Sequence, residues 1–311
     1  MYGLIEGAIV PLSSANIPLW DLGFAQGVAV TEQLRTLGQE LWLLDSHLDR
    51  LEQGLRIAWL EWPEVLGANP RQELARLLHQ LVASSSTQLD PGDDLGCCVV
   101  VTGGDHGRFR PASATPLSGS RLVGHTFRLP HAELARRHRE GVRLITVPTR
   151  EIPAASLDRR LKSRSRMHYW IAQHEAEFAA PGAQALLLDT AGCVAESPAA
   201  TIVAIDGRIR RCLLPAPEAI LPGTCLGWFL DLVSRYGLEV TRKPLHVTDL
   251  QSASEVLSLS TPGIVAPVCA VDGVPIGNGE VGGEIYWQTI VELGERTGVD
   301  LIHQSRQFAG V

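Results

Sequence analysis

Apolar and polar residues alternate with a period of two over residues 26–36, which predicts a half-buried β-strand. Successive side chains of a strand point to opposite faces, so Thr31, Gln33 and Arg35 share one face. A second strand is expected over residues 40–44. The N-terminal part of the chain is therefore expected to contain a β-sheet with a polar row on one side.

Other segments have the periodicity of α-helices. The first is expected to start near Asp45 and to run to Ala58, with Ser46 and Asp49 as a capping pair. The later helices are predicted over residues 70–83, 167–178, 226–233 and 284–295.

Strands and loops are expected between these helices. A buried strand over residues 97–102 leads into the glycine-rich loop 103–108, and the stretch 111–120, rich in Pro, Ser and Ala, predicts a long exposed loop. Residues 185–189 and 193–203 are expected to form a hairpin-like pair of strands.

A chain of 311 residues is long enough for two domains or one large domain. We expect the boundary at Leu129–His131, where the pattern of elements is interrupted. The prediction is a smaller N-terminal α+β domain over residues 1–129, a linker over 130–136 and a larger C-terminal domain over 137–311.

The amino-acid composition indicates which kinds of molecule the protein is expected to bind. The formal net charge is −7 and 20% of the residues are charged, so no general basic surface for nucleic acid is expected and small molecules are favoured. The six cysteines show no Cys-x-x-Cys spacing and predict reduced thiols in a cytoplasmic protein. The sequence has no uninterrupted apolar run of about 20 residues, so neither membrane insertion nor export is expected. Its histidines do not have the spacing of metal ligands, so no metal site is expected.

Lys162 is one of only two lysines among the 27 basic residues, and the other twenty-five are arginines. An amine can lose its proton and attack a carbonyl carbon, whereas a guanidinium cannot. Its neighbours in sequence include Arg159, Arg160, Arg164 and Arg166. Positive charge from these arginines would lower the pKa of the lysine if they point toward it. Lys162 is therefore either a Schiff-base lysine or a surface lysine on a basic helix start.

Several segments carry a resemblance to a known family. They are 21–27 with Glu32 and Arg35 after it, 47–51, 161–163, 186–189 with Gly192 and Glu196, 221–223, and 260–264 before Pro267. In this order they resemble the motifs of class IV (fold type IV) pyridoxal-phosphate enzymes, which are the branched-chain aminotransferases, D-amino acid aminotransferases and aminodeoxychorismate lyases. The resemblance covers most of the chain.

The resemblance implies a mixed α/β, two-domain fold of the D-amino acid aminotransferase type, a homodimer, and pyridoxal 5′-phosphate as the cofactor. It implies that Lys162 holds the cofactor aldehyde as an aldimine and then moves a proton between the substrate Cα and the cofactor C4′. Glu196 would accept a hydrogen bond from the pyridine nitrogen. The groups implied to bind the cofactor phosphate are Arg50, Thr224, Cys225 and Thr261.

The substrate side departs from the family pattern. Pro262 stands where a backbone N–H helps to hold the substrate carboxylate in the branched-chain enzymes, and proline has no N–H to donate. Cys97 or Cys98 replaces a basic residue that is common on the third strand. The candidate substrate residues are Thr31, Arg35, His106, Arg108 and Pro262, with the two arginines and the histidine as possible partners of a carboxylate.

The resemblance favours an aminotransferase that moves an amino group from an amino acid to a 2-oxo acid. The alternative is elimination of pyruvate from 4-amino-4-deoxychorismate, which uses the same lysine, and a third possibility is a cofactor-binding protein without turnover. The segment 277–282 fits G-x-G-x-x-G, but no βαβ unit follows it, so it is interpreted as a turn rather than a dinucleotide site.

Overall fold

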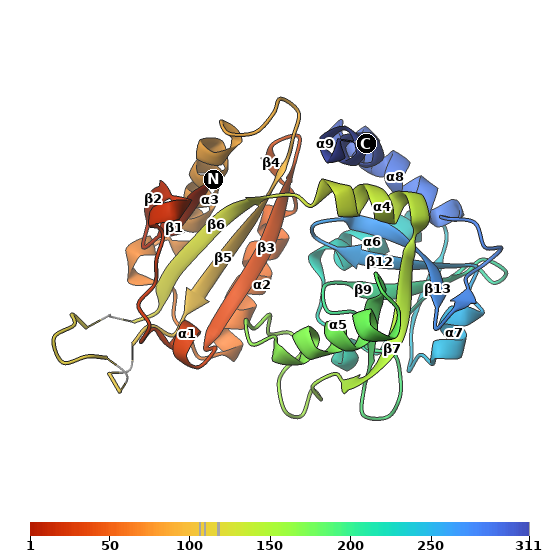
Figure 1. The fold of residues 1–311 in the computed structure, drawn as a ribbon, viewed down its shortest axis with the longest axis horizontal. Helices are drawn as coiled ribbons and strands as arrows, with labels where there is room; N and C mark the ends of the chain where they lie inside the picture. The colour runs from red at the N-terminus through yellow and green to blue at the C-terminus, as the bar shows by residue number, and fades with distance from the viewer. Residues whose placement is uncertain (106, 109, 117–118, 311) are drawn as a thin grey trace. The chain divides into compact units, whose positions relative to one another are not determined.

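The structure is a computed structural model that describes residues 1–105, 107–108, 110–116 and 119–310 (Figure 1). The chain divides into two compact units. Unit 1 contains Met1–Leu129 and Arg160–Ser165, and unit 2 contains Pro130–Arg159 and Arg166–Val311. Each unit is built on its own β-sheet, so the predicted mixed α/β fold class is confirmed.

Unit 1 contains a six-stranded antiparallel sheet with strand order β2-β1-β6-β5-β3-β4. Its strands are β1 (Tyr2–Ile5), β2 (Ala8–Pro11), β3 (Ala29–Leu37), β4 (Glu40–Leu41), β5 (Leu95–Thr102) and β6 (Arg121–Arg128). Its helices are α1 (Leu22–Ala25), α2 (Leu44–Ile57) and α3 (Pro70–Ser86), with short 3-10 helices η1 (Leu12–Ser14) and η2 (Glu64–Leu66).

Helices α2 and α3 pack on one face of this sheet, and their leucines form the core of unit 1 with the inward side chains of the strands (Figure 1). Val30 and Leu34 of β3 belong to this core, whereas Thr31, Gln33 and Arg35 alternate with them and belong to the opposite face. The two-residue period predicted for β3 is confirmed. Burial of each such leucine or valine stabilises the folded state by roughly 1.5–3 kcal/mol. This stabilisation determines which face of β3 packs against the core.

The start of α2 differs from the prediction. The helix begins at Leu44, and Leu43 before it has a left-handed backbone with φ of 54° and provides no side-chain cap. Ser46 lies within the first turn, and the carboxylate of Asp49 pairs with Arg71 of α3. The predicted capping pair is therefore wrong, because Asp49 binds the neighbouring helix and not the amides of its own.

The segment Arg160–Ser165 belongs to unit 1 because its backbone pairs with the first residues of β3. The amide of Thr31 donates to the carbonyl of Lys162, and the amide of Arg164 donates to the carbonyl of Ala29, each at 3.0 Å. A β-bridge lies between these two hydrogen bonds. The segment is thus a short additional strand along the edge of β3, and it satisfies backbone groups that the edge would otherwise leave unpaired.

Unit 2 contains an eight-stranded mixed sheet with the order β11-β10-β9-β12-β13-β7-β8, and β14 pairs with β13. Its strands are β7 (Val142–Arg150), β8 (Gln184–Leu188), β9 (Thr201–Asp206), β10 (Arg211–Leu214), β11 (Glu239–Arg242), β12 (Glu255–Ser260), β13 (Ile264–Val271) and β14 (Val274–Pro275). Its helices are α4 (His131–Glu140), α5 (Met167–Ala179), the 3-10 helix η3 (Pro217–Ala219), α6 (Thr224–Arg235), α7 (Val247–Gln251), α8 (Glu284–Thr297) and α9 (Leu301–Ala309).

Helices cover the strands of unit 2 at several places. Helix α5 packs against β7 and β8, α6 against β12 and β11, and α4 against α9 and β13 (Figure 1). The small side chains of Ala172 and Ala176 are fully buried where α5 meets the sheet. The opposite face of α5 is apolar but exposed, as described below.

Two predictions for unit 2 are corrected by the structure. Most of the residues predicted as a linker over 130–136 lie in α4, which buries Leu134 and Ala135. The hairpin-like pairing is confirmed only for residues 187–189 with 193–196, because β9 then turns away and pairs with β12 and β10. Helix α9, which follows α8, was not predicted.

Candidate active site

Lys162 lies in the segment on the edge of β3, close to a buried ionic cluster of unit 1. The cluster joins Glu32 of β3 to His47 and Arg50, which lie three residues apart on one face of α2. Burial lowers the pKa of His47, although the hydrogen bond to Glu32 opposes this shift. The positive charges of Arg50 and Lys162 lower the pKa of His47 further, so Lys162 acts electrostatically on the cluster. Lys162 itself is half-buried.

The cluster fixes the guanidinium of Arg50. Its Nε and Nη2 atoms donate to the two carboxylate oxygens of Glu32 at 2.8 and 2.7 Å, and His47 Nδ1 lies 2.7 Å from the same carboxylate. Burial would raise the pKa of Glu32, but Arg50 and His47 outweigh it and lower that pKa to about 2. The carboxylate is thus charged at neutral pH and holds Arg50 in one orientation.

The predicted substrate residues of unit 1 have different surroundings. Thr31 is buried, and its hydroxyl donates to the carbonyl of Val99 at 2.9 Å. Arg35 is also buried; its Nε donates to the carbonyl of Thr36 at 2.9 Å and its Nη2 lies 4.0 Å from Asp94. The structure therefore gives Arg35 partners within its own unit.

The glycine-rich loop carries the remaining two candidates of unit 1. Arg108 is exposed there, whereas His106 lies outside the described residues. These two candidates therefore stay predictions.

Glu196 in unit 2 is buried and tightly bonded. Its Oε1 atom accepts a hydrogen bond from the hydroxyl of Tyr169 at 2.7 Å and another from Arg159. Arg159 also forms an ion pair with Glu151 at 2.8 Å, so one guanidinium serves two carboxylates. Burial raises the pKa of Glu196, although Arg159 and Tyr169 counteract this shift.

Unused bonding capacity remains in this cluster. Among the residues that the structure describes, Glu151 Oε2 and Arg159 Nε are buried and have no hydrogen-bond partner. Sequence reasoning missed Tyr169 and Glu151 as members of the cluster. The position of Tyr169 on α5 could have been proposed from helical spacing, but its distance from Glu196 could not.

Three of the four arginines near Lys162 in the sequence interact with other groups in the structure. Arg159 binds two carboxylates, and Arg166 lies over the ring of Tyr169 at 4.5 Å while donating to the carbonyl of Pro198. The positive charge of Arg164, which is exposed, acts on Cys98 of β5 and His125 of β6.

The predicted phosphate-binding residues of unit 2 lie at two turns. Thr224 and Cys225 are the first residues of α6, and the N-cap residue Gly223 has no side chain that could cap them. A Cβ atom on Gly223 would lie 3.3 Å from Thr201 Oγ1, so glycine lets the chain approach Thr201 closely. The backbone N–H groups of a helix start favour an anion.

Thr261 and Pro262 form the turn between β12 and β13. Thr261 is half-buried there and offers a hydroxyl, whereas Pro262 offers no backbone N–H. Thr261 thus fits an anion-binding role better than its neighbour.

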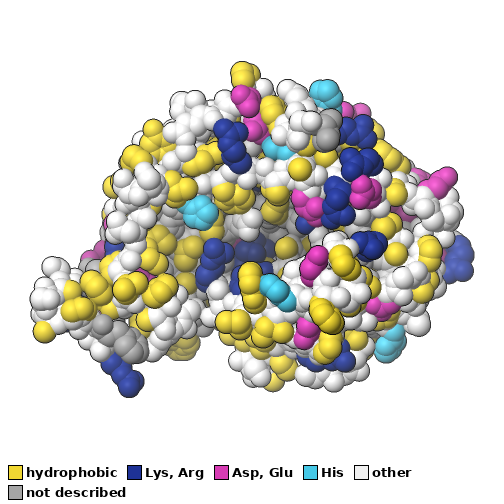
Figure 2. Space-filling model, in the orientation of Figure 1, with side chains coloured by type: hydrophobic (Ala, Val, Ile, Leu, Met, Phe, Trp, Pro, Cys, Tyr) yellow, Lys and Arg dark blue, Asp and Glu magenta, His cyan; other side chains and the backbone are white. Residues whose placement is uncertain are grey.

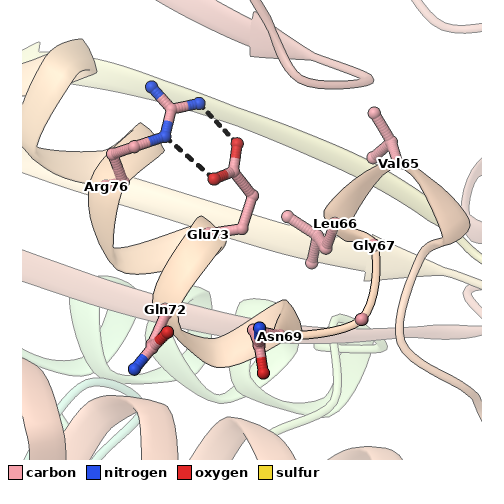
Figure 3. Close-up of a pocket in the computed structure, with 8 residues that line it drawn as sticks. Val65, Leu66, Gly67, Asn69, Gln72, Glu73 and Arg76 are labelled. Atoms are coloured by element: carbon pink, nitrogen blue, oxygen red, sulfur yellow. Dashed lines mark hydrogen bonds and ion pairs between the residues drawn. The ribbon is translucent and has the colours of Figure 1, made fainter.

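Two spaces within the single units are lined by none of the predicted site residues. A groove of about 520 Å³ in unit 1 lies between η2 and α3, and Figure 3 shows Glu73 paired with Arg76 beside it. A cavity of about 240 Å³ in unit 2 has Glu151, Asp189 and Glu218 among its lining residues. Of the candidate clusters described above, only that of Glu151 borders one of these two spaces.

The surface shows mixed charge. On the face drawn in Figure 2, the Lys and Arg side chains of the described residues are interspersed with Asp and Glu. Within the described ranges, no three His, Cys, Asp or Glu side chains are arranged to hold a metal ion. The helices in the same ranges are all too short or too polar to cross a membrane.

Comparison with known proteins agrees with the resemblance. The sequence model for amino-transferase class IV matches residues 29–271. A putative branched-chain-amino-acid aminotransferase of Methanocaldococcus jannaschii is 24% identical over 278 residues, which are 89% of this chain and 90% of that protein.

Solved structures share the fold. The branched-chain amino acid aminotransferase of T.th., crystallised with pyridoxamine 5′-phosphate, superposes with a TM-score of 0.80 at 22% identity and covers 99% of this chain and 96% of that one. The 4-amino-4-deoxychorismate lyase of Pseudomonas aeruginosa superposes with a TM-score of 0.77 at 22% identity, covering 96% and 99%. Because the family model spans most of the sequence, from β3 to β13, the chain belongs to the class IV aminotransferases, a family that depends on pyridoxal phosphate.

Proposed function

We propose that this protein is a pyridoxal-phosphate-dependent aminotransferase that moves an amino group from an amino acid to a 2-oxo acid. The observation that carries the proposal is the position of Lys162, whose backbone is bonded to the edge of β3 beside the Glu32–Arg50–His47 cluster. A surface lysine on a helix start would need no such anchoring.

The donor set fits the cofactor. It combines an amine on a fixed backbone, a buried carboxyl group with a raised pKa, and a helix start followed by hydroxyl groups. Lys162 would bind the cofactor aldehyde, Glu196 its ring nitrogen, and Arg50, Thr224, Cys225 and Thr261 its phosphate. When bound, the cofactor supplies an electron-withdrawing ring that stabilises negative charge on the Cα of the amino acid.

Lys162 has a second task in this proposal. Its Nζ atom accepts the proton from the substrate Cα and later returns it, which is general acid–base chemistry that an arginine cannot perform. The backbone bonds of the segment hold the lysine Cα, so the four-carbon side chain provides the movement that the proton transfer needs.

Glu196 is oriented by Tyr169 and Arg159. Its raised pKa follows mainly from burial, and it means that the carboxyl group attracts a proton more strongly than an exposed glutamate. A ring nitrogen next to it would share that proton in a strong hydrogen bond. Arg159 is in this view a positioning residue, because it acts through Glu196.

Thr31 and Arg108 are proposed to bind the substrate. Arg35 is a weaker candidate, because its side chain is already bonded to the carbonyl of Thr36 and lies near Asp94. Pro262 would shape the site without donating a hydrogen bond.

Pro262 is also the observation that supports the second candidate function, lysis of 4-amino-4-deoxychorismate. The carboxylate grip of the branched-chain enzymes is incomplete without a backbone N–H at this position.

The two functions are distinguished by the fate of the amino group. We expect the protein loaded with pyridoxal phosphate to lose its visible absorbance when an amino acid is added and to regain it with a 2-oxo acid. Separate additions of L- and D-amino acids identify the donor class. Pyruvate release from aminodeoxychorismate, with the absorbance unchanged by every amino acid, would replace the aminotransferase by the lyase.

Lys162→Ala is expected to lower turnover by at least about 10³-fold, because the variant loses both covalent attachment and the proton-transferring amine. Lys243, the only other lysine of the chain, pairs with Asp249 at 2.9 Å and offers a matched control, so Lys243→Ala should keep its activity. Borohydride reduction of the loaded protein, followed by peptide mass spectrometry, should find the cofactor on residue 162. A cofactor adduct on Lys243 would refute the assignment.

Glu196→Gln is expected to reduce kcat by about 10²-fold while KM changes little, since the variant retains the shape but not the proton-attracting carboxylate. Tyr169→Phe removes one hydrogen bond to Glu196 and should cost only a few-fold. Steady-state kinetics of both variants, at saturating cofactor, provide the test. Equal effects of the two changes would argue against a direct role of Glu196.

We further propose that the protein forms the homodimer that the family pattern implies. Helix α5 exposes an apolar row whose members are Met167, Trp170, Ile171 and Phe178, and Phe178 is 94% exposed. A groove of about 370 Å³ lies along this row. A second copy of the chain covering it would remove a large apolar surface from water.

Phe178→Asp is expected to weaken the dimer at least about tenfold, because burial of one phenylalanine contributes roughly 1.5–3 kcal/mol. Sedimentation velocity over a concentration series gives the dissociation constant. Val291→Asp, at a 57% exposed apolar position of α8, is the control and should leave it unchanged. A dimer that is equally stable in both variants would exclude α5 from the interface.

A further inference from the structure

Three side chains of unit 1 form a polar cluster on the sheet face opposite α2 and α3. Cys98 of β5 lies directly across from His125 of β6 in the strand register. The hydroxyl of Thr31 on β3 lies 3.6 Å from the sulfur of Cys98. Arg164, in the segment that carries Lys162, adds a positive charge that acts on both Cys98 and His125.

We propose that Cys98 is a peroxide-sensitive thiolate, paired with the imidazolium of His125, and that its oxidation to a sulfenic acid disturbs the strand edge that holds Lys162. The second part rests on the proposed function, and the first does not.

The charges around the sulfur favour the ion pair. Burial would raise the pKa of Cys98, but His125 and the charge of Arg164 outweigh it and leave that pKa below its ordinary value. Cys98 in turn raises the pKa of His125, although burial and Arg164 oppose this shift. Both shifts stabilise the same pair of charges, thiolate and imidazolium.

The other cysteines provide a comparison within the chain. Cys97 is the next residue of β5 but points into the leucine core of unit 1, where burial raises its pKa. Burial likewise raises the pKa of Cys193, Cys212 and Cys269. Selective oxidation at Cys98 therefore follows from its charged neighbours and not from exposure, since Cys98 is only 4% exposed.

The reaction balances with hydrogen peroxide as the oxidant. The thiolate sulfur attacks one peroxide oxygen, an S–O bond forms, and the O–O bond breaks. The sulfur loses two electrons to the peroxide, and the departing hydroxide takes a proton from the His125 imidazolium to become water. His125 thus serves first as the counter-ion and then as the proton donor.

Thr31 connects the sulfur to Lys162. Its hydroxyl contacts Cys98, and its backbone amide donates to the carbonyl of Lys162 at 3.0 Å. An oxygen added to a sulfur that is almost fully buried must displace a neighbour, and Thr31 is the nearest polar one. Oxidation should therefore shift the strand edge and reduce turnover.

The first test measures oxidation at each cysteine and needs no activity. The protein is treated with hydrogen peroxide, quenched with catalase, denatured in the presence of dimedone, and digested for mass spectrometry. We expect the dimedone adduct on Cys98 to form at least about tenfold faster than on Cys97. Equal rates at the two cysteines would overturn the proposal.

Variants test the role of the charges. His125→Asn should slow oxidation of Cys98 about tenfold and move the midpoint of its pH dependence up toward the ordinary thiol pKa of about 8.5. His79→Asn, at an exposed histidine of α3, is the control and should change neither. Arg164→Gln, which alters an exposed residue, should slow oxidation about twofold and provides the test if circular dichroism shows His125→Asn to be unfolded. Unchanged rates in the folded variants would refute the ion pair.

The coupling to Lys162 is tested with activity. Peroxide should reduce turnover of the wild type in parallel with the adduct on Cys98, whereas treated Cys98→Ser should keep the turnover of untreated Cys98→Ser, whatever that value is. If Cys98 oxidises selectively but turnover is unaffected, the coupling through Thr31 is wrong while the thiolate stands. If no substrate is turned over at all, the proposed function fails, and the adduct measurements still decide the first part.

Discussion

The backbone pairing of Arg160–Ser165 with the start of β3 is the constraint on which the candidate site depends. β4 covers this edge only at Thr36 and Leu37, and β5 lies on the other side of β3. The first residues of β3 would therefore present unpaired amides and carbonyls without the segment. Because the pairing uses main-chain atoms, it places Lys162 at a fixed point along the strand whatever its neighbouring side chains are.

Two buried glutamates illustrate how the hydrogen-bond partners decide the state of a carboxyl group. Glu32 is bonded by both Arg50 and His47, and its pKa is lowered to about 2 in spite of burial. Glu196 shares Arg159 with Glu151, and burial prevails, so its pKa is raised. The first carboxylate is suited to fixing a cation in place, and the second to sharing a proton with a ligand. Both glutamates are buried, so depth alone does not distinguish them.

Sequence patterns predicted the parts of the fold that have strong periodicity. The inward and outward faces of β3 and the helices α3, α5, α6 and α8 follow from apolar spacing, which burial enforces. Helix α4 was missed because charged residues dominate it and its apolar stripe is reduced to Leu134 and Ala135 with the buried histidines at its ends. Such a helix depends on its contacts with α9 and β13, which no local pattern reveals.

Only some residues of the candidate site could be identified from the sequence. Lys162 was identified because lysine is rare in this chain, and Glu196 by the family motif. The partners of Glu196 could not be found from the sequence, since Arg159 and Tyr169 reach it from segments 37 and 27 residues away. The sequence also could not show that Arg159 binds two carboxylates and that Arg166 lies over the ring of Tyr169, because a guanidinium acts where its side chain points and not where its residue number lies.

Cys97 and Cys98 also show that neighbours in the sequence can have different surroundings in the fold. They are adjacent in the sequence and have the same side chain, yet one faces leucines and the other faces a histidine. The pleat of β5 separates them, and the register with β6 decides which residue of that strand Cys98 meets. A shift of one residue in that register would place Gly124 or Thr126 opposite Cys98 and remove the imidazole. The reactivity of the thiol is therefore a property of strand pairing, fixed by the same core that orders the sheet.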